Sequence, residues 1–206
     1  MTREQEAAVI QAVLDGDINA YELLVKEYEK NVYNLALRMV GNSEDAADMS
    51  QEAFIKAYNS LTSFRGDSKF SVWLYRIVSN VCLDSLRSRG RRQTVSLSAE
   101  NDDGEDVEID IADETQSPER LLDRRLTRDA VRRGLAALPP EHRQILLLRE
   151  IQGLSYDEIA DALGIEAGTV KSRIFRARKK LCAFLIKDGN IPEFVSSSKQ
   201  RGGDLS

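Results

Sequence analysis

The side chains with the clearest chemistry lie between positions 169 and 179. A helix that turns Val170 and Ile174 inward leaves the following residues toward solvent or on the flanks: Thr169, Lys171, Ser172, Arg173, Phe175, Arg176 and Lys179. Arginine can bond guanine O6 and N7 in the major groove, and an apolar ring can meet a thymine methyl. The alternative, a solvated basic face, does not explain an aromatic side chain among arginines. The pattern therefore predicts a DNA-reading surface.

Two helices are expected to hold this surface in a helix-turn-helix. Ser155-Tyr156-Asp157-Glu158 is a capping box, in which the serine hydroxyl accepts from the amide of Glu158 and the carboxylate accepts from the amide of Ser155. The first helix carries Ile159, Ala160 and Leu163 inward and ends at Gly164, a residue suited to a left-handed turn. The second helix covers 166–181, with apolar residues at 170, 174, 177 and 181.

The chain lacks the residues and motifs that common catalytic and cofactor-binding sites require. His142 is the single histidine, and Cys82 and Cys182 lie far apart on apolar helical faces, so buried thiols are favoured over a metal site. Neither a GxGxxG nor a GxxxxGK[ST] loop occurs. We expect no enzyme activity, no cofactor and no bound metal. Since no stretch reaches the roughly 20 apolar residues of a membrane span, and no signal peptide is recognisable, we expect a cytoplasmic protein.

The charges divide the chain into segments of different kinds. Residues 94–117 carry nine Asp and Glu and no Lys or Arg, whereas 118–187 carry fifteen Lys and Arg against nine Asp and Glu. An acidic segment poor in large apolar side chains favours a flexible linker extended by self-repulsion. We expect an all-α protein with two small helical domains, 1–93 and 118–187, joined by the linker 94–117 and followed by a disordered tail, 188–206.

Helical spacing continues through the first domain. Apolar residues at 21, 24, 25, 28, 32, 35 and 39 form one face, and Gly41 closes that helix. Asn42 or Ser43 can cap the next helix, whose stripe at 46, 49, 53, 54, 57 and 61 leaves its acidic face to solvent. A further helix is expected from about Ser71 to Ser88, followed by an arginine cluster, 87–92, that suits phosphate binding or helix termination.

In their order, these segments resemble the extracytoplasmic-function (ECF) sigma factors, group 4 of the sigma factors of bacterial RNA polymerase. Segments 154–160 and 168–173 are similar to the family's region 4, which reads the -35 promoter element. Segment 45–58 is similar to the region 2 face that binds core polymerase, which the resemblance assigns to Asp45, Asp48, Gln51, Glu52 and Lys56. Segment 64–80 is similar to the part that reads and melts the -10 element, through Phe64, Arg65, Asp67, Lys69, Trp73, Arg76 and Asn80.

For two of these residues the sequence also allows a role in the fold instead of in DNA binding. Trp73 lies in an apolar stripe and is slightly favoured as a core residue, and Asn80 can be a satisfied polar group within its helix. The resemblance instead places Asn80 in a pocket for a flipped base. Phe64, on a loop, suits an aromatic group that holds an unstacked base.

The resemblance implies a non-catalytic factor that directs promoter-specific initiation. Its partners would be the polymerase beta-prime coiled coil and beta flap, promoter DNA and a membrane-associated anti-sigma factor, and its linker would thread the polymerase channels. The main alternative is a stand-alone helix-turn-helix regulator. Such a protein would carry a receiver or sensor domain with alternating strands and helices, a pattern that the first domain lacks. A nucleic-acid enzyme is a distant third.

Overall fold

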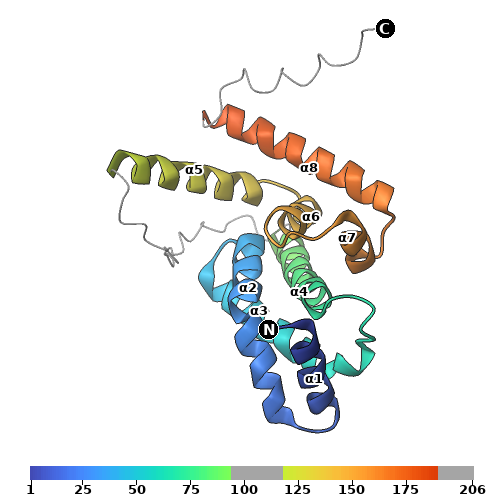
Figure 1. The fold of residues 1–206 in the computed structure, drawn as a ribbon. Coiled ribbons are helices and arrows are strands. Elements are labelled where there is room, and N and C mark those ends of the chain that lie inside the picture. The colour runs from blue at the N-terminus through green and yellow to red at the C-terminus, as the bar shows by residue number, and fades with distance from the viewer. Residues whose placement is uncertain (94–117, 190–206) are drawn as a thin grey trace.

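The computed structural model describes residues 1–93 and 118–189, and these fold into helices with short connections (Figure 1). In chain order the helices are α1 (Arg3–Leu14), α2 (Tyr21–Val40), α3 (Ser43–Asn59), α4 (Phe70–Gln93), α5 (Pro118–Ala136), α6 (Pro140–Glu150), α7 (Tyr156–Leu163) and α8 (Ala167–Lys187), with 3-10 turns η1 (Ile18–Ala20) and η2 (Leu61–Ser63). The described residues contain no strand, which confirms the all-α prediction. The predicted linker, 94–117, and residues 190–206 of the predicted tail lie outside the described residues.

Most predicted helix ends are observed with the expected chemistry. The Asn42 side chain accepts from the amide of Asp45 at 2.8 Å and caps α3, and Gly41 ends α2 with a left-handed φ of 92°. Two helices run further than expected. Helix α4 starts at Phe70 and continues to Gln93, so Arg87 and Arg89 belong to it, and α8 continues to Lys187 instead of ending at position 181. Leu185 explains the second extension, because it is buried and continues the apolar stripe.

The first domain is a bundle of α1 to α4. Helices α2, α3 and α4 contact one another, and α1 packs on α2. Small residues along α3, Ala46, Ala53 and Ala57, are fully buried and let its neighbours approach closely. Tyr21 bridges α2 and α3, because its hydroxyl donates to the carbonyl of Phe54 at 2.7 Å. The apolar faces predicted from spacing are therefore the faces that pack.

The second domain is formed by α5 to α8, with α8 in contact with all three other helices. Ile159, Val170, Ile174 and Ala177 are buried where α7 and α8 meet α6. Ala162, at 6% exposure, is more completely covered than Ala160 and Leu163, which are half-buried. Among the cysteines, Cys82 of α4 is fully buried, and burial raises the pKa of its thiol to about 12. Cys182 of α8 is half-buried, so the expectation of two buried thiols holds only for Cys82.

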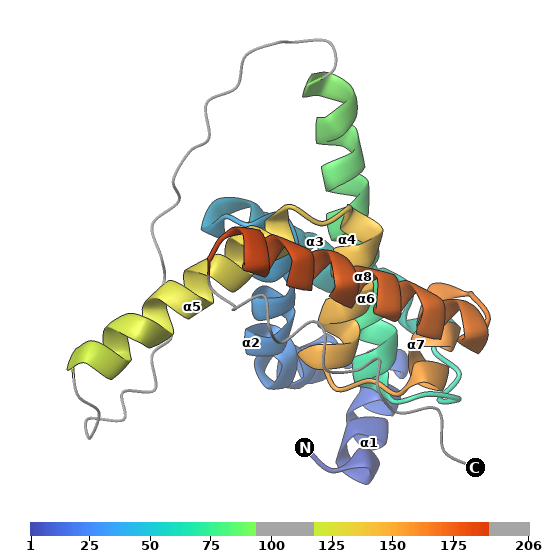
Figure 2. The ribbon, with the colours of Figure 1, turned by 90° about the horizontal axis from the view of Figure 1, so that it is seen from above.

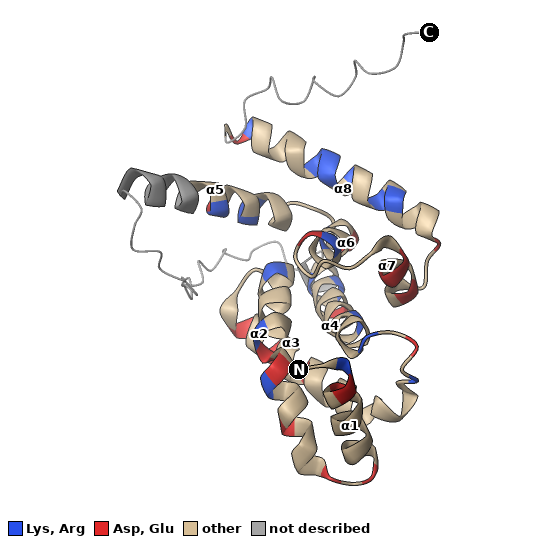
Figure 3. Cartoon of the chain, in the orientation of Figure 1, with Lys and Arg blue, Asp and Glu red and all other residues tan. Residues whose placement is uncertain are grey.

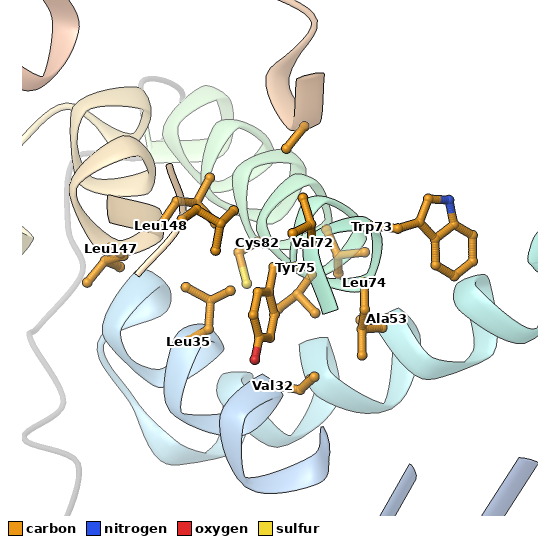
Figure 4. Packing of buried hydrophobic residues seen from close by; sticks show 14 of the residues in the cluster. Val32, Leu35, Ala53, Val72, Trp73, Leu74, Tyr75, Cys82, Leu147 and Leu148 are labelled. Carbon is orange, nitrogen blue, oxygen red and sulfur yellow. The ribbon is translucent and has the colours of Figure 1, made fainter. Parts of the chain in front are cut away.

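One apolar core runs through both domains. Helix α4 lies between α2 and α3 on one side and α6 and α7 on the other. Figure 4 shows Leu147 and Leu148 of α6 near Leu35 and Cys82 of the first domain, and all four side chains are buried. The view turned by 90° shows α6 alongside α4 as well (Figure 2). In this arrangement the two domains pack directly on each other.

Buried polar groups also cross the boundary between the domains. Gln144 of α6 donates from Nε2 to the hydroxyl of Ser79 of α4 at 2.9 Å, and both side chains are buried. The Arg143 guanidinium donates to the carbonyl of Met39 near the end of α2, and to the carbonyls of Leu135 and Ala136 at the end of α5. Helix ends leave such carbonyls without an intrahelical partner, so one cation satisfies a helix end in each domain.

The glycines of α4 and α5 provide a test of the packing of α5 on α8. A Cβ at Gly134 would lie 2.6 Å from Cδ1 of Leu181 and 3.1 Å from Cδ1 of Phe184, whereas a Cβ at Gly90 would meet nothing within 4 Å. We expect Gly134→Leu to lower the free energy of unfolding by about 1 to 3 kcal/mol through overpacking. The control Gly90→Leu should raise it by about 0.5 kcal/mol through helix propensity. Urea unfolding measures both, and equal effects would contradict the packing.

Candidate nucleic-acid interface

The predicted DNA-reading residues lie together on the outer face of α8. Phe175 is 69% exposed, and Lys171, Arg176 and Lys179 are also exposed. Thr169, Ser172 and Arg173 are half-buried, and the Ser172 hydroxyl donates to the carbonyl of Thr169 at 3.0 Å. Figure 3 shows basic segments along α8 and acidic segments on the neighbouring α7. Helix α8 thus presents an aromatic ring and several cations on one open surface, here called the α8 face.

The helix before α8 is fixed by the predicted capping box. The amide of Glu158 donates to Ser155 Oγ at 3.1 Å, and the amide of Ser155 donates to Glu158 Oε2 at 2.8 Å. This backbone bond, together with a smaller contribution from Lys69, holds the pKa of the Glu158 carboxyl below its usual value. Gly164 then turns the chain with a φ of 63°. The angle between α7 and α8 is therefore set by local backbone chemistry and by buried residues.

Charged side chains of α8 also interact with residues of α6. Arg178 donates to the carboxylate of Glu150, with Nε at 3.1 Å, so this arginine braces α8 against α6. His142 lies on α6 beside the basic side chains, and its pKa is lowered first by burial and then by Lys180, Arg173 and Arg176, against an opposing effect of Glu141. Lys180, Arg173 and Arg176 thus lie near one another and near His142 at this surface, and clustered cations suit phosphate binding.

The loop predicted to take part in DNA melting carries an aromatic cluster. The rings of Phe64 and Trp73 lie 5.4 Å apart, and each lies about as close to Phe70, at 5.6 and 5.5 Å. Phe64 is half-buried, whereas Trp73 is only 6% exposed. The structure thus places Trp73 in the core, as its apolar stripe favoured. Phe64 is the ring of this cluster that a base could reach.

The remaining candidates for the -10 element are spread along the loop and α4. Arg65, Asp67 and Lys69 are exposed before α4 begins, and the Lys69 ammonium lies 3.2 Å from the carboxylate of Glu158 in α7. Within α4, Arg76 is half-buried, and Asn80, about one turn further along, is exposed. The exposed side chain of Asn80 is accessible to a ligand.

The predicted polymerase-binding residues lie on the outer side of α3. Asp48, Gln51 and Lys56 are exposed, and Glu52 is half-buried and pairs with Lys56 at 2.7 Å. Asp45 differs from the others, because both of its carboxylate oxygens accept from the guanidinium of Arg89 at the end of α4. That hydrogen-bonded arginine holds the pKa of Asp45 below its usual value. Asp45 therefore joins two helices of its own domain.

Two exposed apolar residues lie on the α3 surface: Tyr58, within the segment that resembles the polymerase-binding face, and Ile55, which the sequence did not assign. Ile55 is 62% exposed and Tyr58 is 37% exposed, and both follow Gln51 and Glu52 at helical spacing. An apolar centre within a charged rim is characteristic of a protein-binding surface. The spacing of the polar residues indicated this face, but only the packing of Phe54 and Ala57 inward shows that Ile55 remains outside.

Metal-ligand clusters and membrane-spanning helices are both absent from the described residues. Residues 1–93 and 118–189 contain no group of three or more His, Cys, Asp or Glu side chains that could hold a metal ion. Within the same residues no helix is both long enough and apolar enough to span a bilayer.

Comparison with known families matches both domains. A family model described as Sigma-70 region 2 matches residues 24–92, and one described as Sigma-70, region 4 matches residues 128–181. The chain is 43% identical over 183 residues to the RNA polymerase sigma-H factor of Pseudomonas aeruginosa, covering 88% of this chain and 94% of that protein. It is 42% identical over 180 residues to the ECF RNA polymerase sigma-E factor of Escherichia coli K12, covering 85% and 92%.

Solved structures agree in fold. CnrH, in complex with the cytosolic domain of CnrY, aligns with a TM-score of 0.61 at 25% identity over 88% of this chain and 97% of that chain. The sigma factor RpoE of Bartonella quintana, in complex with the anti-sigma factor NepR, aligns with a TM-score of 0.62 at 24% identity over 83% and 99%, which supports the fold. With both regions matched in order, the chain belongs to the ECF sigma factors, the non-catalytic subunits that direct bacterial RNA polymerase to promoters.

Proposed function

We propose that the chain reads the -35 element with the α8 face and opens the -10 element with α4 and its preceding loop, while α3 binds core polymerase. The observation that carries this proposal is the α8 face, where Phe175, Arg176 and Lys179 are exposed on a braced helix-turn-helix. In this division residues 1–93 hold the polymerase and the -10 element, residues 118–187 hold the -35 element, and residues 94–117 connect them.

At the -35 element, the exposed side chains of α8 suit different parts of the major groove. Arg176 can bond a guanine edge in two places, and Phe175 can pack on a thymine methyl. Lys171 and Lys179 suit the phosphates on either side, which position the helix without reading the sequence. The fixed turn at Gly164 and the bond between Arg178 and Glu150 keep the helix from rotating while it reads.

At the -10 element, Phe64 and Asn80 are the residues with groups available to an unstacked base. Phe64 offers a ring edge supported from behind by Phe70 and Trp73, and Asn80 offers an exposed amide with donors and an acceptor. Trp73 acts here as the buried support of Phe64. Arg65, Lys69 and Arg76 supply cations for the phosphates of the opened strand.

Polymerase binding is assigned to the outer surface of α3. Ile55 and Tyr58 provide its apolar centre, and Asp48, Gln51, Glu52 and Lys56 provide the polar rim. Asp45 contributes through its pair with Arg89, which holds the start of α3 against the end of α4. Asp48, Gln51, Ile55 and Lys56 are exposed with the domains packed, so this surface is accessible in the free chain.

A sigma factor of this kind works where polymerase and chromosome are, so we place it in the cytoplasm and assign it no catalytic activity. We also propose a membrane-associated anti-sigma partner. The structural relatives CnrH and RpoE were solved in complex with the cytosolic domain of CnrY and with the anti-sigma factor NepR. Support for such a partner in this chain rests on the shared fold.

Reconstituted transcription tests the proposed function. Purified chain with core polymerase should initiate from a limited set of promoters of its source genome, with little promoter binding by the chain alone. Alanine at Asp48, Gln51 and Ile55 together should lower core binding at least tenfold, because it removes the rim and the apolar centre. Alanine at the exposed residues Glu22 and Lys26 of α2 serves as the control. Initiation from no promoter would refute the function.

The assignment of the α8 face predicts how substitutions change the promoter sequence preference. Arg176→Ala should cost about 1 to 3 kcal/mol of promoter binding by the holoenzyme and relax the preference at one base pair, because a bidentate base contact is lost. Lys179→Ala should weaken binding evenly across sequences and reduce its salt dependence. A randomised -35 library, selected with each variant, measures both effects. An even loss from both variants would contradict the assignment of the face.

The anti-sigma partner is testable with the chain as bait. Affinity capture from detergent extracts of unstressed cells should recover a membrane protein that competes with core polymerase for the chain. Capture after pre-incubation with saturating core polymerase should recover much less of it, because the binding surfaces overlap. If competition is absent, the partner is not an anti-sigma factor.

A further inference from the structure

We propose that His142 of α6, together with Arg173 and Lys180 of α8, forms a phosphate-binding site for one strand of duplex DNA. This inference rests on the proposed function of the α8 face in reading the -35 element, and it extends that surface from α8 to α6. The site holds the DNA backbone and therefore contributes to affinity, while Phe175 and Arg176 read the bases.

Basic side chains lie on two opposite flanks of the α8 face. Lys171 and Arg173 are two residues apart, which places them about 200° apart around the helix axis. A basic residue follows each of them about two turns later, Arg178 on the flank of Lys171 and Lys180 on the flank of Arg173. Because a helix is about as wide as the major groove, each flank of a helix in the groove faces the phosphates of one strand.

Helix α6 packs on α8 and offers a different group to each flank. At the C-terminal end of α6, Glu150 accepts from Nε of Arg178 at 3.1 Å, so one flank is partly neutralised. At the N-terminal end of α6, His142 lies close enough to Lys180 and Arg173 for their charges to act on its ring. Within residues 1–93 and 118–189 neither of these two cations pairs with a carboxylate. The second flank therefore keeps its positive charge and gains an imidazole.

The histidine ring is held with one of its nitrogens inside the protein. His142 is half-buried, and its Nδ1 is buried with no hydrogen-bond partner in the described part of the chain. The backbone amide of His142 donates to the carbonyl of Pro139 at 2.9 Å, which fixes the residue in the first turn of α6. Nε2 is therefore the ring nitrogen left to a ligand. In a protonated imidazole this nitrogen donates a hydrogen bond, which phosphate oxygens accept.

The charge of His142 depends on the groups beside it. Burial lowers the pKa of His142, and Lys180, Arg173 and Arg176 lower it further, against an opposing effect of Glu141. A phosphate beside the ring has the opposite charge and favours the protonated form, so the pKa is higher in the DNA complex than in the free chain. Binding therefore takes up a proton. The affinity is lowest above the pKa of the complex, rises as the pH falls, and levels off below the pKa of the free chain.

The other charged groups around His142 keep their charge near neutral pH. Arginine and lysine side chains, which α8 supplies, titrate well above this range. Glu141 stays ionised, because its own backbone amide and then Arg87 of α4 hold its pKa below the usual value. Arg87 also lies 3.9 Å from the carboxylate of Asp84. Since His142 is the single histidine of the chain, a change in DNA affinity near neutral pH that its substitution removes reports on this residue.

The test measures binding of the full-length chain to a short fluorescein-labelled DNA duplex of mixed sequence, by anisotropy at low salt. Phosphate contacts carry no sequence information, so the duplex needs no promoter. The variants are His142→Gln, His142→Lys and Lys180→Gln, each measured at about pH 5.5 and about pH 8. Lys30→Gln, at an exposed lysine of α2, makes the same charge change as Lys180→Gln and serves as the control. Circular dichroism at both pH values checks that each variant is folded.

We expect His142→Gln to weaken binding about three- to tenfold at the lower pH and less than about twofold at the higher pH, because only the protonated ring adds a charge. His142→Lys should bind tightly at both pH values, since its ammonium stays charged. Lys180→Gln should weaken binding at both and lower the slope of log affinity against log salt by about one. Lys30→Gln should change the affinity less than about twofold.

Two results would overturn the site. One is a loss for His142→Gln that is equal at both pH values or that His142→Lys does not restore, because the residue then acts through the fold. The other is binding by Lys180→Gln equal to that of Lys30→Gln.

Transcription separates this inference from the proposed function. If the unsubstituted chain with core polymerase initiates normally and His142→Gln shows no pH-dependent loss on the duplex, only the phosphate site is refuted. If the unsubstituted chain initiates nowhere, the proposed function fails, and the duplex measurement still decides whether His142, Arg173 and Lys180 bind phosphate.

Discussion

Helix α4 must be covered on two opposite sides, and the rest of the structure follows from this requirement. Its residues Val72, Trp73, Leu74 and Tyr75 are all buried, although four consecutive residues of a helix point in every direction around its axis. One bundle of helices cannot satisfy such a segment alone. Helices α2 and α3 cover one side and α6 and α7 cover the other, so the core of the first domain continues into the second.

The contact between the two domains contains polar groups as well as apolar ones. Arg143 is buried, and desolvation lowers its pKa, yet its donors reach carbonyls at the ends of α2 and α5. Gln144 and Ser79 form a second buried polar contact. A buried polar group is tolerated only with its partner, so these bonds favour one relative position of the domains. On separation the same groups can bond water, which makes such an interface easier to open than an apolar one.

The packing of the two domains leaves most of the candidate functional residues exposed. The α8 face and the α3 surface are exposed in the packed chain, while Arg76 is half-buried; Lys69 and Arg87 pair with carboxylates of the second domain but remain exposed. The α3 surface is therefore open to a protein partner in the packed chain.

The sequence alone determined the helices, their caps and the α8 face, because these depend on neighbours three and four residues apart. The capping box at Ser155, the turn at Gly164 and the exposure of Phe175 all follow from local spacing. Only the tertiary structure decided the partners of residues distant in sequence. Asp45 pairs with Arg89, Trp73 supports Phe64 from the core, and Glu141 and Glu158 meet Arg87 and Lys69. Periodicity shows which side of a helix is buried, but it carries no information on which distant helix buries it.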